Sequence, residues 1–91
     1  MGEHDLEEFF LNTKPVKILV KLRQQTSENY ASALSTQVNA TYSHTVKVLQ
    51  KMKEYGLVEF DKKGRKKEVS LTDRGAELAE DFHEILQRLK D

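Results

Sequence analysis

The sequence has 91 residues, no cysteine and 15 basic against 15 acidic residues. This length indicates a single domain, and the lack of cysteine excludes disulfide bridges and thiolate metal sites. No apolar run approaches the roughly 18–20 residues that a membrane-spanning helix needs, and the acidic N-terminus does not resemble a signal peptide. We therefore expect a cytoplasmic protein without a membrane partner.

The charges are unevenly distributed along the chain. Residues 41–67 hold eight basic and three acidic residues, a net charge of +5, while residues 1–40 carry −1 and residues 68–91 carry −4. Because salt screens charges beyond about 8–10 Å, a locally basic surface can bind phosphate in a neutral protein. The middle block is therefore a candidate nucleic-acid-binding region. The alternative is that its lysines only solvate a helix face and a hairpin tip.

The chain is expected to begin with a short helical extension, residues 1–12. Its apolar residues have the spacing of one helical face, and they are Leu6, Phe9 and Phe10. A second helix is expected to begin near Pro15, which fits a first turn because its missing N–H would have no partner there, with Asn12 or Thr13 as the cap. The apolar stripe of this helix comprises Val16, Ile18, Leu19 and Leu22.

Residues 30–55 have the pattern of two helices joined by a tight turn. The first helix is expected over residues 30–37, with Ser27 or Asn29 as its cap. Asn39 suits the turn because asparagine tolerates a left-handed backbone. The second helix is expected from Thr41 or Tyr42 to Tyr55. Its buried face is predicted to contain Thr45, Val48, Leu49 and Met52.

A β-hairpin and a final helix follow. The wing, residues 57–71, is expected to contain two strands, residues 57–60 and 68–71, because apolar and polar residues alternate in both, and the turn between them contains Gly64. Thr72 is the expected cap of a helix over residues 73–90. The apolar stripe of that helix comprises Ala76, Leu78, Ala79, Phe82, Ile85, Leu86 and Leu89.

Two short blocks are the most specific motifs of the chain: Tyr55-Gly56-Leu57-Val58 after the second helix, and Leu71-Thr72-Asp73-Arg74-Gly75 after the hairpin. The other matching residues are Leu34, Ser35, Val38, Thr41, Thr45, Leu49 and Met52. On these residues, the chain resembles winged helix-turn-helix transcriptional regulators of the multiple-antibiotic-resistance regulator (MarR) type. The resemblance covers roughly residues 14–90. It implies an α+β, mainly helical fold with a three-helix core, a two-stranded wing and a long C-terminal helix.

The resemblance also implies a symmetric dimer with the recognition helix in the major groove and the wing near the minor groove. Typical members are longer, with additional terminal helices that form the dimer interface. Their wing usually carries an Asp-Arg pair whose arginine reaches the minor groove. Here Lys63-Gly64-Arg65 occupies that region, and Arg65 is the nearest match.

The candidate DNA contacts come from the start of the recognition helix and from the wing. Helix-turn-helix proteins insert the N-terminal end of this helix into the groove, where lysine reaches guanine or phosphate and valine touches a thymine methyl. Cations in the wing suit the phosphate backbone, although such residues also protect sheet edges from aggregation. The candidate residues are Thr41, Tyr42, Ser43, Val46, Lys47, Lys62, Lys63, Arg65 and Lys66.

Surplus apolar surface at the two chain ends predicts a homodimer. A compact winged helix does not need these side chains for its own core, and exposed apolar stripes are unusual in monomers. The candidate interface comprises Leu6, Phe9, Phe10, Phe82, Ile85, Leu86 and Leu89. The alternative is that the N-terminal segment folds back over the final helix of its own chain.

An enzyme is not expected. The three histidines, His4, His44 and His83, have no metal-ligand spacing, and there is no glycine-rich phosphate loop. We expect no cofactor, and the sequence does not indicate whether a small-molecule effector exists. The predicted function is sequence-specific binding of double-stranded DNA by a transcriptional regulator, a repressor at a pseudo-palindromic operator. The alternative is a winged-helix module that contacts proteins and does not bind DNA.

Overall fold

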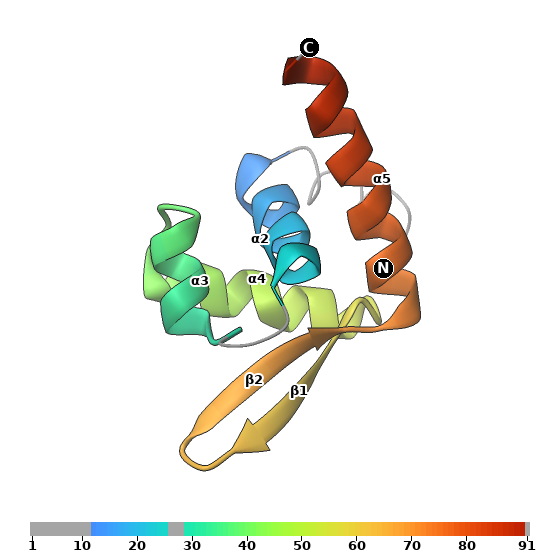
Figure 1. The fold of residues 1–91 in the computed structure, drawn as a ribbon. Coiled ribbons are helices and arrows are strands. Elements are labelled where there is room, and N and C mark those ends of the chain that lie inside the picture. Colours follow the sequence, from blue (N-terminus) through green and yellow to red (C-terminus); the bar gives the residue numbers. More distant parts are fainter. Residues whose placement is uncertain (1–11, 26–28, 91) are drawn as a thin grey trace.

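Helices and one β-hairpin make up the part of the chain that the computed structural model describes, residues 12–25 and 29–90 (Figure 1). The elements are α2 (Thr13–Gln24), α3 (Ala31–Gln37), α4 (Tyr42–Glu54), β1 (Val58–Lys63), β2 (Lys66–Leu71) and α5 (Asp73–Lys90). This order confirms the predicted α+β, mainly helical winged helix-turn-helix. The predicted N-terminal extension, with Leu6, Phe9 and Phe10, lies outside the described residues.

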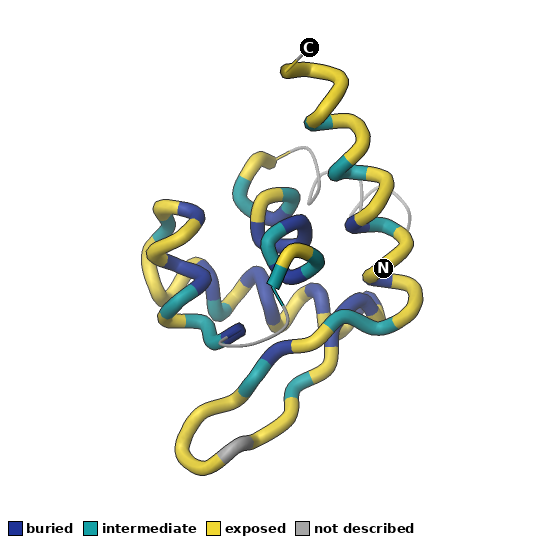
Figure 2. Tube along the Cα trace, in the orientation of Figure 1, coloured by how far each residue is buried: buried dark blue, intermediate teal, exposed yellow. Residues whose placement is uncertain are grey.

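The core lies where α2, α3 and α4 meet the base of the hairpin (Figure 2). The predicted stripe of α2 is buried at Ile18, Leu19 and Leu22, and α4 buries all four of its predicted inward residues. Removing these side chains from water is the main driving force that holds the three helices together. The core cluster comprises Ile18, Leu19, Leu22, Leu34, Val38, Val48, Leu49, Met52, Tyr55, Leu57, Val58, Val69 and Ala79.

Asn29 does not cap α3, so that prediction was wrong. The N-cap residue is Tyr30, which makes no side-chain cap bond. The Asn29 side chain is buried and pairs with Gln25: its Nδ2 donates to the Gln25 carbonyl at 3.1 Å, and its Oδ1 accepts from Gln25 Nε2 at 2.9 Å. The Asn29 carbonyl accepts from the Val69 N–H at 2.8 Å. Asn29 therefore ties the segment before α3 to the wing, because a buried amide needs partners.

The turn between α3 and α4 has the predicted chemistry. Asn39 has a φ of 57°, in the left-handed region that asparagine tolerates. Lys14 of α2 reaches across and donates to the carbonyls of Val38 and Asn39, each at 2.8 Å. Thr41 caps α4 by accepting from the His44 N–H at 3.1 Å. The start of the recognition helix is thus held by specific hydrogen bonds.

The two strands of the wing are longer than predicted. They pair from Val58↔Leu71 at the base to Lys63↔Lys66 at the tip, so only Gly64 and Arg65 form the turn. Gly64 has a φ of 64°, which fits the first central position of a two-residue hairpin turn and matches the twist of the strands. A turn this short allows the ladder to continue to its end. The wing therefore projects from the core as a narrow hairpin (Figure 1).

The two specific sequence motifs meet at the base of the wing. Thr72 donates from its N–H to the Leu57 carbonyl at 3.0 Å and from Oγ1 to the Gly56 carbonyl at 2.6 Å. The same Oγ1 accepts from the Gly75 N–H at 3.1 Å, which is the predicted cap of α5. Arg74 Nη1 donates to the Tyr55 carbonyl at 3.1 Å. We call these contacts, together with the Gly75 approach described next, the wing-base junction.

Gly75 is the tightest point of the wing-base junction. A Cβ at this position would lie 1.9 Å from the Leu57 carbonyl oxygen, a backbone atom that cannot rotate away. Only glycine allows the first turn of α5 to approach the start of the wing so closely.

Helix α5 packs mainly on α2, and its far end extends beyond the core (Figures 1 and 2). Ala79 is fully buried and Phe82 packs partly buried against the core, whereas Ile85 and Leu89 are exposed. The 18 residues of α5 span about 27 Å at 1.5 Å per residue, so the helix is about as long as the smallest extent of the molecule, 26 Å. None of the described helices combines the length and hydrophobicity that crossing a membrane requires.

We expect Gly75→Ala to lower the free energy of unfolding by about 1–3 kcal/mol because the added methyl group overpacks the junction. Helix propensity alone predicts the opposite sign, a gain of up to about 1 kcal/mol. Urea denaturation followed by circular dichroism measures the difference. Glu77→Ala, at an exposed position in the same helix, is the control and should change stability by less than about 0.5 kcal/mol. A stabilised Gly75→Ala variant would show that the close approach is unimportant.

Candidate nucleic-acid interface

The outer face of α4 is defined by the residues that the core holds on its inner face. Thr45, Val48, Leu49 and Met52 are buried. The side chains of Ser43, Lys47 and Gln50 are therefore directed outward and are exposed, and Val46 is half-buried at the edge of this face. Tyr42, at the first position of the helix, is 61% exposed. Two or more turns of the helix thus present polar and apolar side chains to a partner.

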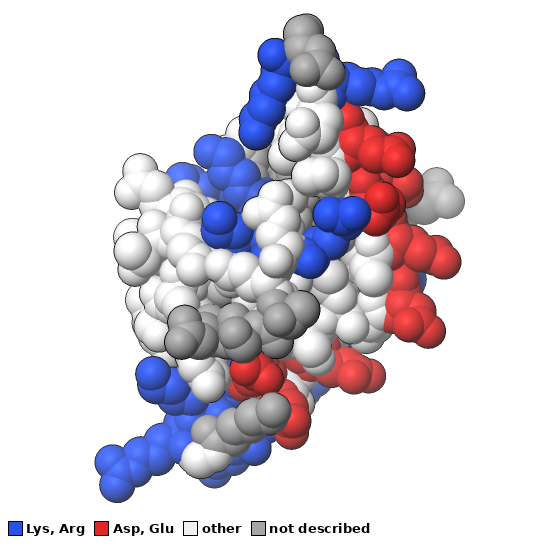
Figure 3. Space-filling model, viewed as in Figure 1, with Lys and Arg blue, Asp and Glu red and all other residues white. Residues whose placement is uncertain are grey.

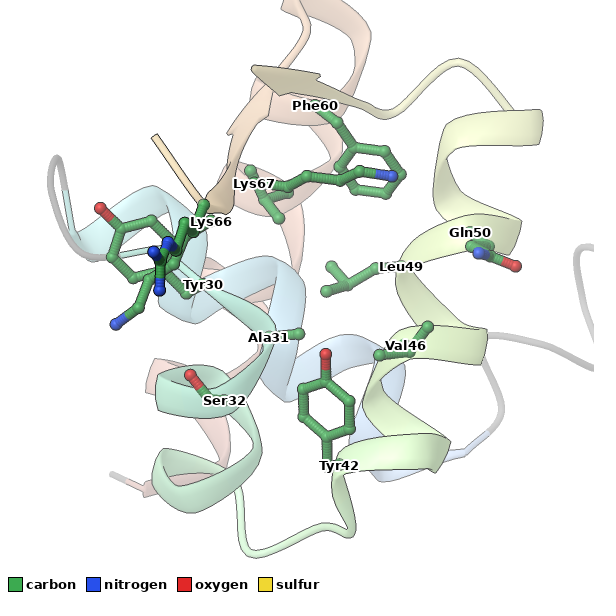
Figure 4. A pocket seen from close by; sticks show the side chains of 12 residues that line it. Tyr30, Ala31, Ser32, Tyr42, Val46, Leu49, Gln50, Phe60, Lys66 and Lys67 are labelled. Carbon is green, nitrogen blue, oxygen red and sulfur yellow. The ribbon is translucent and has the colours of Figure 1, made fainter. Parts of the chain in front are cut away.

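A groove with a volume of about 480 Å³ lies between α3, α4 and the wing. Its lining includes the aromatic residues Tyr30, Tyr42 and Phe60, and Figure 4 shows them arranged around it. Val46 and Gln50 belong to the α4 side, while Arg65, Lys66 and Lys67 belong to the wing. The groove therefore brings the recognition helix and the cationic hairpin to one surface.

Two lysines of the wing lie over aromatic rings. Lys66 Nζ lies 4.9 Å from the centroid of the Tyr30 ring, and Lys67 Nζ lies 5.9 Å from the centroid of Phe60 (Figure 4). Lys53 Nζ of α4 approaches the same Phe60 ring at 5.3 Å. Such contacts are weak at exposed sites but orient the ammonium groups without neutralising them. The positive charge stays available to an anion.

The register of the hairpin places like charges opposite one another. Lys62 pairs with Lys67, and Lys63 pairs with Lys66. Like charges at directly opposed positions destabilise a sheet. Within a free protein this arrangement is unfavourable, and a polyanion bound along the hairpin would relieve it.

Charge is separated over the surface of the molecule (Figure 3). Blue basic side chains gather at the tip of the wing, and others lie on α2 and at the far end of α5, whereas red acidic side chains follow most of α5 and lie beside the upper part of the wing. The exposed acidic residues of α5 include Glu77, Glu80, Asp81 and Glu84. Glu80 is paired with Arg23 of α2 at 2.7 Å, an exposed contact that contributes little to stability. The wing end of the molecule is the end suited to a negative partner.

The structure brings most of the predicted DNA-contact residues to this surface. Thr41, Tyr42, Ser43 and Lys47 are exposed at the start of α4, and Lys62, Arg65 and Lys66 are exposed on the wing. Lys63 lies at the end of β1, and its side chain is outside the described part. Thr41 contributes its hydroxyl to the cap of α4.

Eight of the twelve lining residues were not among the predicted contacts, and Tyr30 and Gln50 are two of them. Gln50 lies four residues after Val46 and three after Lys47, so helical spacing alone puts it on their face. That signal was present in the sequence. Tyr30 carried no comparable signal, because its position beside Lys66 depends on how the wing folds back toward α3.

The predicted dimer residues of α5 lie in different environments. Ile85 is 50% and Leu89 is 77% exposed, whereas Phe82 packs against the core of its own chain. Leu86 is half-buried and lines a second groove between α2 and α5. In the described part of the chain, no group of three or more His, Asp or Glu side chains could hold a metal ion.

Solved structures with the same fold include AF1382 from Archaeoglobus fulgidus, with a TM-score of 0.82 and 24% identity over 88% of this chain and 91% of that one. MepR, a transcription regulator of the Staphylococcus aureus multidrug efflux pump MepA, has a TM-score of 0.79 and 19% identity over 97% and 67%. The MarR family transcriptional regulator SPO1453 from Silicibacter pomeroyi DSS-3 has a TM-score of 0.75 and 22% identity over 85% and 55%. At these identities the similarity concerns the fold. No curated protein matches the chain by sequence.

The sequence also matches a family model over residues 11–75, which is well over half of the chain. This range contains the helix-turn-helix, the wing and the wing-base junction. The model describes a winged helix DNA-binding domain. The chain therefore belongs to the winged helix DNA-binding domain family.

Proposed function

We propose that the protein binds double-stranded DNA with sequence preference and acts as a transcriptional regulator. The observation that carries this proposal is the meeting of the outer face of α4 and the cationic wing at one groove. A helix of this kind fits the major groove, and a flanking cationic hairpin suits the phosphate backbone. A MepR–DNA complex has the same fold, with a TM-score of 0.80 and 18% identity over 97% of this chain and 67% of that one.

The proposed regulator is a cytoplasmic repressor that blocks transcription by occupying a pseudo-palindromic operator. It acts by binding rather than by catalysis. The recognition helix supplies sequence preference through Tyr42, Ser43, Val46 and Lys47, while the wing supplies electrostatic affinity. A protein retained neither on heparin at low salt nor by random duplex DNA would instead favour a winged-helix module for protein contacts.

The proposed DNA-binding form is a homodimer. The exposure of Ile85 and Leu89 supports it, because both continue the apolar line of α5 beyond the end of the core. Pairing of two α5 helices would bury these side chains, and a two-fold axis would give each half of a palindrome one recognition helix. The two recognition helices would then lie about 34 Å apart, one turn of DNA.

We expect Lys47→Ala to weaken binding to the preferred duplex by about 1–3 kcal/mol and to relax preference at one position. The reason is that the exposed ammonium group lies within the first turns of α4, where base edges are read. Fluorescence anisotropy with the preferred and scrambled duplexes measures both effects. Lys90→Ala, which removes the same charge at the far end of α5, is the control. Equal weakening on every sequence would make Lys47 a phosphate contact, and no weakening would remove it from the interface.

We expect the wing to supply affinity with little sequence information. Each lysine or arginine on a phosphate contributes about 0.9 to the slope of log K against log salt. Changing Lys62, Lys63, Arg65 and Lys66 together to glutamine should flatten this slope by about three to four units without changing the preferred sequence. The control changes Lys17 and Lys90 to glutamine, which are away from the wing. An unchanged slope in the wing variant would show that the hairpin does not contact DNA.

We expect the double variant Ile85→Glu with Leu89→Glu to be monomeric, because it places charges at the exposed apolar positions of α5 without disturbing the core. Sedimentation equilibrium at micromolar concentration measures the mass. Gln87→Glu, an exposed change on the same helix, should remain dimeric. Phe82 is unsuitable for this test because it packs against its own core. A monomeric wild-type protein would contradict the dimer proposal.

A further inference from the structure

Gln50 occupies the middle of the outer face of α4. It is exposed, it lies one turn beyond Val46, and it projects from the helix at the rim of the groove (Figure 4). One further turn on, the helix carries both Lys53, which lies over the Phe60 ring, and Glu54. Gln50 is thus the last uncharged polar residue of α4 that lines the groove.

The Gln50 amide makes no hydrogen bond to any residue in the described part of the chain, so it has no structural task there. A carboxamide carries an acceptor oxygen and an NH₂ donor side by side. In the major groove adenine offers the complementary pair, an N6 amino donor beside the N7 acceptor, and glutamine binds this pair through two hydrogen bonds. Guanine offers two acceptors at the same edge and suits lysine or arginine instead.

We infer that Gln50 is a specificity residue that reads an adenine in the major groove, an inference that rests on the proposed DNA binding. Val46, half-buried one turn earlier on the same side of α4, would place its methyl groups against the neighbouring base step. A thymine methyl is the apolar group available there. The preferred half-site therefore contains an adenine at the Gln50 position.

The test is selection of duplexes from a random library by the wild-type protein and by Gln50→Glu. A carboxylate retains the acceptor and loses the donor, so it can accept from the N4 amino group of cytosine but no longer pairs with adenine N7. We expect the preferred base at one position to change from adenine to cytosine. The ratio of affinities for the two matched duplexes should change by about 10- to 100-fold.

Two controls separate base reading from other effects. Gln87→Glu makes the same chemical change on α5, away from the groove, and should leave the preferred sequence unchanged. Gln50→Glu itself should unfold at the same urea concentration as the wild type, because its side chain is exposed. A general loss of affinity from the added negative charge acts on every duplex alike, so the ratio of affinities, not the affinity, is the measurement.

The outcomes distinguish the inference from the proposal beneath it. A wild-type protein that selects an adenine-containing sequence, with that adenine replaced by cytosine in Gln50→Glu, supports both. A wild-type protein that selects a sequence that Gln50→Glu leaves unchanged overturns the role of Gln50 and leaves DNA binding intact. A wild-type protein that selects no sequence overturns the proposed function itself.

Discussion

The close approach of Gly75 to the Leu57 carbonyl is the constraint on which the relative positions of α4, the wing and α5 depend. At this point the end of α4, the start of β1, the end of β2 and the start of α5 meet within a few residues. Thr72 connects them with three hydrogen bonds, one from its N–H and two through its hydroxyl. Because the backbone groups at helix ends need partners, these bonds also complete the end of one helix and the start of another. The groove between α4 and the wing has its shape because this corner is closed.

At the wing, the charge distribution lowers the stability of the isolated protein and favours binding of a negatively charged partner. Lys62 is directly opposite Lys67 in the hairpin register, an arrangement that costs free energy in the isolated chain. The acidic residues of α5 keep the whole protein neutral while leaving the wing basic. A neutral protein with one basic end approaches a polyanion in a preferred orientation, because its field steers the encounter. Net charge alone would have concealed this property.

Local sequence patterns predicted the helices and strands, whereas contacts between residues far apart in the sequence determined the features that were not predicted. The buried stripe of α4 and the caps at Thr41 and Thr72 follow from helical spacing and from hydrogen bonds within one turn, so they were predictable. The cap of α3 was not predictable, because Asn29 forms hydrogen bonds with Gln25 and Val69 instead. Helical spacing predicted that Phe82 belongs to an exposed apolar stripe along α5, but it packs on the core. The angle between α5 and α2 decides this, and that angle cannot be predicted from local spacing. Among the site residues, the outer face of α4 was predictable from periodicity, whereas the aromatic side of the groove depends on the fold.

The wing-base junction connects α5 directly to the end of the recognition helix. At one end of α5, Thr72 and Arg74 donate to the carbonyls of Gly56 and Tyr55, the two residues that follow α4, while the other end of α5 extends beyond the core. Helix α5, about 27 Å long, therefore connects the exposed apolar positions at its far end to the end of α4. In the proposed dimer, the angle at which the two α5 helices cross would set the distance between the recognition helices. A contact that changes this crossing angle would then alter operator spacing from the opposite end of the molecule, without touching any residue that faces DNA.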